Sequence, residues 1–269
     1  MFKPTEIVVK QAHDAHLYPS RRSVQVVESR QLTSGVYMLR LRDEFIAKHA
    51  KPAQFINVYS HDAQRLLPRP FGVCNIQDDI VTIMYAVIGD GTEEFSHLQA
   101  GDFIDILGPL GKPYDLQKSA HYVLIGGGLG IPPVLSAAQY LAVRDDVKTT
   151  AVLGYRDEKF ADDIAKQYVA DVHSISNSEG NVITVLQQLQ QQLQHDDLPV
   201  ICIACGPAPM MKAIAHWAKE FDFACQFSLE ERMGCGYGTC VACVVDTVDG
   251  RKKVCVDGPV FTSEDLGWR

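Results

Sequence analysis

The sequence predicts a multi-domain protein with three parts: an antiparallel β domain over residues 1–115, an α/β domain over 116–223, and a small C-terminal module over 224–269. Three observations support this division. Short strand patterns fill the first part, strands alternate with helices in the second, and glycine and cysteine are concentrated in the third. A chain of 269 residues is long enough for two domains and an appendage.

The first part carries five short segments rich in Val, Ile, Tyr and Phe, separated by turn residues. They cover residues 23–29, 35–42, 54–60, 80–88 and 102–108. Several alternate apolar and polar residues, as half-buried antiparallel strands do. Short strands at this spacing, without helical patterns between them, predict a small barrel or sandwich.

The second part repeats a strand, a turn and a helix. Residues 121–144 read as a buried strand, a glycine turn and a helix that opens near Pro132 and Pro133. Residues 149–158 form a second buried strand pattern, 181–194 an amphipathic helix, and 199–221 another strand, turn and helix. This alternation predicts a parallel sheet covered by helices on both faces.

Charge and hydropathy exclude two classes of partner. The formal net charge of −8 argues against a nucleic-acid surface, which needs clustered Lys and Arg. No run of about 18 apolar residues is present, so we expect no membrane-spanning helix. The first 20 residues lack the apolar core of a signal peptide, and we therefore expect a cytoplasmic protein.

The C-terminal module contains half of the eight cysteines, Cys235, Cys240, Cys243 and Cys255, in the segments "RMGCGYGTCVACVV" and "KKVCVDGPVF". The C-x4-C-x2-C spacing with a fourth cysteine further along is that of a plant-type [2Fe–2S] cluster. Neighbouring glycines allow the backbone to wrap a cluster closely. A zinc site and a disulfide pair are the alternatives. Zinc modules usually pair two separate knuckles, and a reducing cytosol disfavours disulfides.

Two glycine-containing regions indicate nucleotide binding. The stretch "GGGLGIPP" over residues 126–133 follows a strand and precedes a helix, where a dinucleotide's phosphates approach the backbone. In the β domain, "RPFGV" at residues 69–73 and "GDGT" at 89–92 offer an arginine and a phosphate-binding turn. Each pattern alone is also compatible with a tight turn or a surface arginine, and their coexistence favours the nucleotide interpretation.

"RPFGV", "GDGT", "GGGLGIPP" and "CGP" follow one another in the order found in the ferredoxin–NADP reductase superfamily. The cysteine segments narrow this resemblance, over the whole chain, to the electron-transfer subunits of two-protein, NAD-dependent dihydroorotate dehydrogenases. The resemblance implies an antiparallel β-barrel that binds FAD, a parallel-sheet domain that binds the nicotinamide nucleotide, and a [2Fe–2S] module.

The resemblance also implies site residues. The flavin elements are Arg69, Pro70, Phe71 and Gly72, then Met84, Tyr85 and Ala86, then Gly91 and Thr92. The nicotinamide side comprises Gly126, Gly127, Gly128, Gly130 and Pro133, with Cys205, Gly206 and Pro207. The metal ligands are the four cysteines of the module. Gly72 replaces a usual serine, and Ala86 replaces a frequent basic residue.

The implied function is an electron relay, because a flavin joins one-electron cluster chemistry to two-electron nicotinamide chemistry. Dihydroorotate would be oxidised on the FMN of a catalytic partner subunit, in a heterotetramer with two copies of each chain, for pyrimidine synthesis. The chain itself shows no acid–base constellation, so we expect no catalytic residue for dihydroorotate.

Arg156 beside Asp157 and Glu158 leaves the choice between NAD and NADP open on sequence grounds, and the resemblance favours NAD. The alternatives are a reductase subunit of a hydrogenase or ferredoxin-dependent transhydrogenase, and a stand-alone NADH oxidoreductase.

Overall fold

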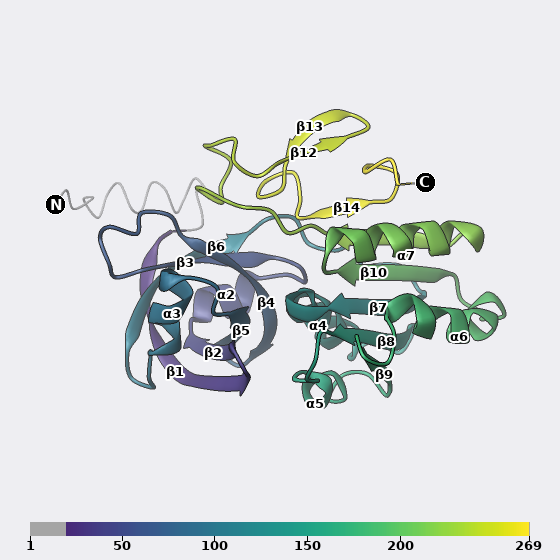
Figure 1. Cartoon of the computed structure of the whole chain (residues 1–269), viewed down its shortest axis with the longest axis horizontal. Coiled ribbons are helices and arrows are strands. Elements are labelled where there is room, and N and C mark those ends of the chain that lie inside the picture. The colour runs from purple at the N-terminus through teal and green to yellow at the C-terminus, as the bar shows by residue number, and fades with distance from the viewer. Residues whose placement is uncertain (1–19, 269) are drawn as a thin grey trace.

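The computed structural model describes residues 20–268 and begins with a closed β-barrel (Figure 1). Around the barrel the strands follow the order β1-β2-β5-β4-β3-β6, and all neighbours are antiparallel. They are β1 (Arg22–Thr33), β2 (Val36–Arg42), β3 (Phe55–Tyr59), β4 (Arg69–Gln77), β5 (Ile80–Ala86) and β6 (Phe103–Leu110). Short helices α2 (Glu44–His49) and α3 (Asp90–Ser96) connect them. Closure leaves no unpaired sheet edge in this domain.

Strand β3 illustrates how the barrel forms two different surfaces. Ile56 and Val58 point into the barrel core, where both are fully buried. Phe55, Asn57 and Tyr59 alternate with them and therefore face outward. Phe55 and Tyr59 pack against the C-terminal module. Because successive side chains point to opposite faces, the single strand β3 contributes to the barrel core on one face and to the contact with the module on the other.

The second domain is a six-stranded sheet with the order β14-β11-β10-β7-β8-β9. Five strands are parallel, and only β14 (Val260–Thr262) runs antiparallel, beside β11. The parallel strands are β7 (His121–Gly127), β8 (Lys148–Tyr155), β9 (Asp171–Ser176), β10 (Val200–Cys205) and β11 (Ala224–Ser228). The helices are α4 (Ile131–Leu141), α5 (Asp162–Ala165), α6 (Val182–Gln194) and α7 (Ala208–Glu220), and a 3₁₀ turn spans Gly128–Gly130.

Helices cover both faces of this sheet. Residues of α6 and α7, including Leu186 and Trp217, share one core with Val123 and Ile125 of β7. Residues of α4, including Val134 and Leu141, share the opposite core with Tyr122 and Leu124 of the same strand. The predicted barrel and two-faced α/β sheet are therefore confirmed.

The barrel and the sheet share a core of their own. Helix α4 inserts Ile131 and Leu135 against Met38, Cys74 and Met84 of the barrel. Gln139 of the same helix accepts a hydrogen bond from the Ile76 amide and donates one to the Ile76 carbonyl, at 2.9 and 2.6 Å. The two domains therefore meet along packed, hydrogen-bonded surfaces.

The C-terminal module is tied to the sheet at both ends. Residues 224–228, expected to begin the module, form strand β11 of the parallel sheet. The chain then passes through the cysteine loop and the hairpin of β12 (Val244–Thr247) and β13 (Gly250–Lys253), and returns as β14 beside β11. The module is thus a long excursion between two neighbouring strands of one sheet.

Among residues 20–268, no helix is long and apolar enough to cross a membrane. Residues 1–19, nearly all of the segment from which we expected no signal peptide, lie outside the described residues.

Candidate cofactor cleft and cluster loop

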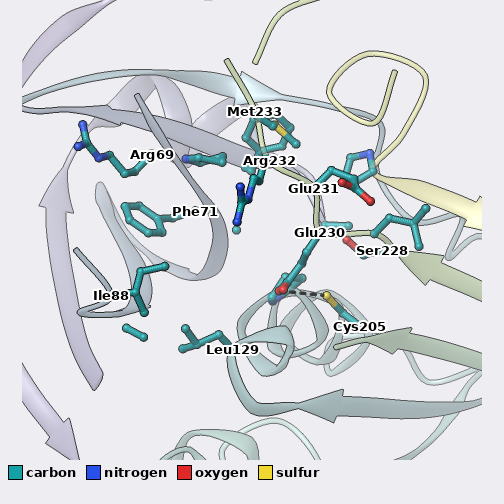
Figure 2. Close-up of a pocket in the computed structure, with 18 of the residues that line it drawn as sticks. Arg69, Phe71, Ile88, Leu129, Cys205, Ser228, Glu230, Glu231, Arg232 and Met233 are labelled. Atoms are coloured by element: carbon teal, nitrogen blue, oxygen red, sulfur yellow. Dashed lines mark hydrogen bonds between the residues drawn. The ribbon is translucent and has the colours of Figure 1, made fainter. Parts of the chain in front are cut away.

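A cleft of ≈ 520 Å³ lies where the barrel, the parallel sheet and the module meet. Figure 2 shows Arg69, Phe71 and Ile88 on its barrel side and Cys205 and Ser228 on its sheet side. All three parts of the chain contribute to its lining: Ala53, Phe55, Arg69, Pro70, Phe71, Gly72, Ala86, Ile88, Thr92, Leu129, Pro133, Cys205, Ser228, Leu229, Glu230, Glu231, Arg232, Met233 and Pro259. The cleft brings together motifs that lie far apart in the sequence.

Arg69 supplies positive charge to the barrel side of the cleft. The side chain is half-buried and donates one hydrogen bond, of 2.7 Å, to the carbonyl of Leu67. It forms no ion pair with any residue in the described part of the chain. A Cβ built on Gly91 would lie 2.1 Å from Arg69 Nη2, so the guanidinium occupies space that only glycine leaves open. This arrangement fits an anionic ligand such as a pyrophosphate.

Phe71 provides an aromatic wall beside this arginine. Its ring packs against Tyr85, at 5.3 Å between ring centres, and edge-on against Phe95, at 6.2 Å. These neighbours fix the ring orientation from the barrel side. A flat aromatic wall next to a positive group fits a flavin nucleotide, which has a planar ring system and a pyrophosphate.

Three other flavin-side residues predicted from the sequence contribute indirectly. Met84 packs under helix α4, and Tyr85 lies in the barrel core with a buried hydroxyl that has no hydrogen-bond partner among the described residues. Burial raises the pKa of Tyr85. Thr92 lines the cleft, but its hydroxyl accepts from the amides of Ile88 and Gly89 and donates to the Gly89 carbonyl. This hydroxyl holds the turn in shape.

The glycine loop of the α/β domain owes most of its glycines to close packing. Added Cβ atoms would lie 2.7 Å from Ile131 at Gly126, 2.5 Å from Met210 at Gly127, and 2.3 Å from the Cys205 backbone at Gly130. Only Gly128, with φ of +55°, faces open space. The loop therefore presents Leu129 and Pro133 to the cleft, while its glycines let two strand ends approach each other.

The same close packing applies to the second loop, after β10. Gly206 has φ of +155°, and its added Cβ would lie 2.5 Å from Met210. Pro207 precedes helix α7 and lies outside the cleft lining, whereas Cys205 lines it. The carboxyl ends of β7 and β10 thus meet at one edge of the sheet, where open α/β sheets bind ligands.

The need for glycine at position 72 is explained by its contact with Pro133, on the α/β-domain side of the cleft. A Cβ at this position would lie 2.7 Å from Cγ of Pro133, the second proline of the glycine loop. Strand β4 and the segment 126–133 are therefore in direct contact at the cleft. Ala86, the other departure from the superfamily pattern, lines the cleft without a charge.

Sequence reasoning missed one functional candidate, Glu230. Its Oε1 lies 3.9 Å from the Cys205 thiol, within hydrogen-bond distance for sulfur (Figure 2). The carboxyl is exposed to the cleft but enclosed by surrounding protein, and this desolvation raises its pKa. Burial, and then the charge of Glu230, also raise the pKa of Cys205. Glu230 stands two residues after the carboxyl end of β11, and this position was the signal in the sequence that could have identified it.

The four module cysteines converge in two pairs. The amide of each of Cys235 and Cys240 donates to the sulfur of the other, at 3.4 Å in both cases. Cys243 and Cys255 are buried, and burial followed by the Cys243 neighbour raises the pKa of Cys255 to about 12. Although burial opposes it, hydrogen bonds from the Cys240, Tyr237 and Thr239 amides lower the pKa of Cys235 to about 7.

The two pairs of cysteines match the ligand arrangement of a two-iron cluster, which takes two thiolates at each iron. Gly236 and Gly238, with φ of +79° and +89°, give the loop the turns that such wrapping requires. The residues present fit a [2Fe–2S] cluster.

The comparisons with known proteins agree with this arrangement. Residues 230–267 match the model of the iron–sulfur cluster binding domain of dihydroorotate dehydrogenase B. Among solved structures, the chain resembles an NADH-dependent reduced ferredoxin-NADP oxidoreductase, with a TM-score of 0.80, 27% identity and coverage of 91% of this chain and 90% of that one. Phthalate dioxygenase reductase has the same fold, with a TM-score of 0.62 at 16% identity over 85% and 87%.

Curated relatives match along almost their whole length. A dihydroorotate dehydrogenase B (NAD⁺) electron transfer subunit from Fusobacterium nucleatum is 34% identical over 90% of this chain and 96% of its own. The subunit from Caldanaerobacter subterraneus is 30% identical over 91% and 98%. These matches confirm the family that the motifs indicated, and the chain belongs to the electron-transfer subunits of NAD⁺-dependent dihydroorotate dehydrogenase B.

Proposed function

We propose that this chain is the oxidoreductase subunit that carries electrons from the FMN of a catalytic dihydroorotate dehydrogenase subunit to NAD⁺ in pyrimidine synthesis. FAD would occupy the cleft, and Cys235, Cys240, Cys243 and Cys255 would hold a [2Fe–2S] cluster. One observation carries the proposal: the segment Glu230–Met233 lines the cleft and leads within two residues to the ligand Cys235. The two predicted cofactor sites therefore share a wall.

Each part of the site has a distinct task in this proposal. The cluster exchanges single electrons, nicotinamide exchanges two as hydride, and a flavin links the two regimes. Arg69 neutralises the flavin pyrophosphate, and Phe71 bounds the planar ring. Leu129, Pro133 and Cys205 form the wall that the nicotinamide approaches, and the Glu230 carboxyl lies beside Cys205 at that wall.

NAD is the favoured nucleotide. Arg156, which could bind the 2′-phosphate of NADP, is exposed and lies 3.7 Å from the Asp157 carboxylate. Asp157 and Glu158 next to it would repel that phosphate. The curated relatives carry NAD⁺ in their names.

The partner would bind at the cluster loop. Three exposed apolar residues of the module lie close to the cluster ligands in sequence: Tyr237 at 53%, Val241 at 73% and Val256 at 44%. They belong to the ligand loop or stand next to a ligand, as Val241 and Val256 do. Such a patch fits a protein contact that brings the cluster close to the partner's flavin. We propose a heterotetramer with two copies of each subunit.

Reconstitution tests the function. The purified chain mixed with the catalytic subunit is expected to form orotate in an NAD⁺-dependent reaction that neither protein supports alone. Orotate production by this chain alone, or no reaction with any catalytic partner, would refute the proposal. NADPH-dependent ferredoxin reduction without orotate formation would instead support the alternative of a transhydrogenase subunit, suggested by the likeness to the ferredoxin-NADP oxidoreductase.

A further inference from the structure

Asn57 is a buried polar residue at the contact between the barrel and the module. It lies in the middle of β3 and is fully buried, on the outward face of the barrel. Its neighbours on that face, Phe55 and Tyr59, belong to the apolar cluster that packs against Cys243, Cys255 and other module residues. A buried amide in such surroundings needs a polar partner, because its desolvation is otherwise costly.

The partner of Asn57 is the cluster loop. Its Nδ2 donates a 2.8 Å hydrogen bond to the carbonyl of Cys235, the first cluster ligand. A Cβ added to Gly236 would lie 2.4 Å from Nδ2 and 2.8 Å from Oδ1, so the loop backbone rests directly on the amide group. The reverse amide orientation would place Oδ1 of Asn57 against the carbonyl oxygen of Cys235, and two acceptors would then face each other. The side chain therefore turns its Nδ2 donor toward that carbonyl.

Asn57 is also connected to the cleft, through the pairing of its strand with β4. On β3 it pairs with Pro70 of β4, which lines the cleft between Arg69 and Phe71. One residue therefore joins the backbone of a cluster ligand, 178 positions away in sequence, to the strand next to the predicted flavin site. The apolar contacts around it exclude water but lack direction, whereas this hydrogen bond sets the position of one carbonyl.

We propose that Asn57 is a positioning residue that clamps the Cys235–Gly236 backbone to the barrel and thereby holds the cluster at a fixed place relative to the flavin. The inference rests on the proposed function, since it assumes that both cofactors bind where described. Outer-shell groups that orient metal ligands typically change metal affinity or activity 10- to 100-fold when removed. Asn57 would act in this way through the ligand's backbone.

Asn75 offers a matched control. Like Asn57, it is a buried asparagine of a barrel strand. Its Nδ2 donates to a side chain of the neighbouring domain, Tyr168, at 3.1 Å, and the Oδ1 atoms of both asparagines have no hydrogen-bond partner among the described residues. Within residues 20–268, the Asn75 side chain forms no hydrogen bond with the module. Asn57→Leu and Asn75→Leu therefore remove the same group from equivalent surroundings, and Asn57→Thr is a second variant that suits a strand if leucine prevents folding.

The experiment uses the full chain purified with its cofactors. Iron release to a chelator and the rate of cluster reduction after NADH addition are measured for each variant, with the paramagnetic spectrum of the reduced cluster. Asn57→Leu and Asn57→Thr are expected to release iron about 10- to 100-fold faster than wild type, to reduce the cluster more slowly, and to broaden the spectrum. Flavin content and flavin reduction by NADH are expected to stay at wild-type levels.

Two results would overturn the inference and leave the proposed function intact. Iron release and cluster reduction within twofold of wild type in both Asn57 variants would show that the clamp is not needed. Equal acceleration in Asn75→Leu would show that loss of any interdomain asparagine has the same effect. A wild-type chain that binds no cluster or no flavin would refute the proposed function, and the inference with it, so the two failures are distinguishable.

Discussion

Gly91 provides a sharp test of the flavin site, because its lack of a side chain makes room for Arg69. A Cβ at position 91 would lie 2.1 Å from Nη2 and 2.2 Å from Cζ of Arg69, far inside the usual contact distance. The obstruction is the end of a flexible side chain, so Gly91→Ala should move the guanidinium and leave the fold intact. Helix α3 should even gain stability, since alanine favours a helix over glycine by about 1 kcal/mol.

The expected loss is one charge-assisted contact to the flavin pyrophosphate. Such hydrogen bonds contribute about 1.5–3 kcal/mol, which corresponds to a roughly 10- to 150-fold weaker FAD affinity. The dissociation constant of FAD for the flavin-free protein, measured by flavin fluorescence, gives this ratio directly. Thermal unfolding of the same samples reports any effect on stability.

Gly89→Ala is the matched control, two residues away. Its φ of 176° is an extended conformation open to any residue, and an added Cβ meets no atom within 4 Å. FAD affinity should therefore stay at the wild-type value. In an Arg69→Ala background, Gly91→Ala should cost no further affinity, because both substitutions remove the same contact. Wild-type affinity in Gly91→Ala, or additive losses in the double variant, would refute the assignment of Arg69.

Three further predictions address the cluster, the domain contact and acid stability. Cys240→Ser should abolish the [2Fe–2S] signal of the reduced protein but keep its flavin absorbance and its NADH-driven dye reduction. The control Cys202→Ser, in the sheet core, should keep the cluster. A lasting signal in Cys240→Ser would contradict the ligand assignment. Gly72→Ser should lower the free energy of unfolding in urea by about 1–3 kcal/mol, because the added Cβ would lie 2.7 Å from the Pro133 ring. An unchanged urea midpoint would show that Pro133 can move away without cost and would contradict this prediction. Hydrogen bonds from Arg144 and then Ser119 lower the pKa of Asp146 from 3.8 to about 2, so its stabilisation exists above pH 3.8 and is lost as pH falls toward 2. Asp146→Asn should thus unfold at lower urea than wild type at pH 7, and the difference should close in acid; a deficit independent of pH would contradict this.

Features encoded over short stretches of chain were determined by the sequence alone. Strand alternation in the first part, the strand–helix repeats in the second and the spacing of Cys235, Cys240 and Cys243 are local patterns, because side-chain direction and ligand reach depend on neighbouring residues. These patterns were sufficient to predict a small barrel or sandwich, the parallel sheet and the cluster type, and the resemblance that the motifs carry added the barrel and the family. Arg69 and Phe71, which the resemblance assigned to the flavin from one short motif, both line the cleft.

Contacts between distant parts of the chain were decided only by the tertiary structure. No local pattern relates Gly72 to Pro133, Asn57 to Cys235, or Glu230 to Cys205, since each pair meets through the packing of separate elements. Residues 224–228 were assigned to the module by composition, yet they pair with β10 because a hydrogen-bonding sheet edge was available there. The glycines after β7 show the same limit: sequence indicated a phosphate loop, whereas the close approach of Cys205 and Met210 explains why glycine is required.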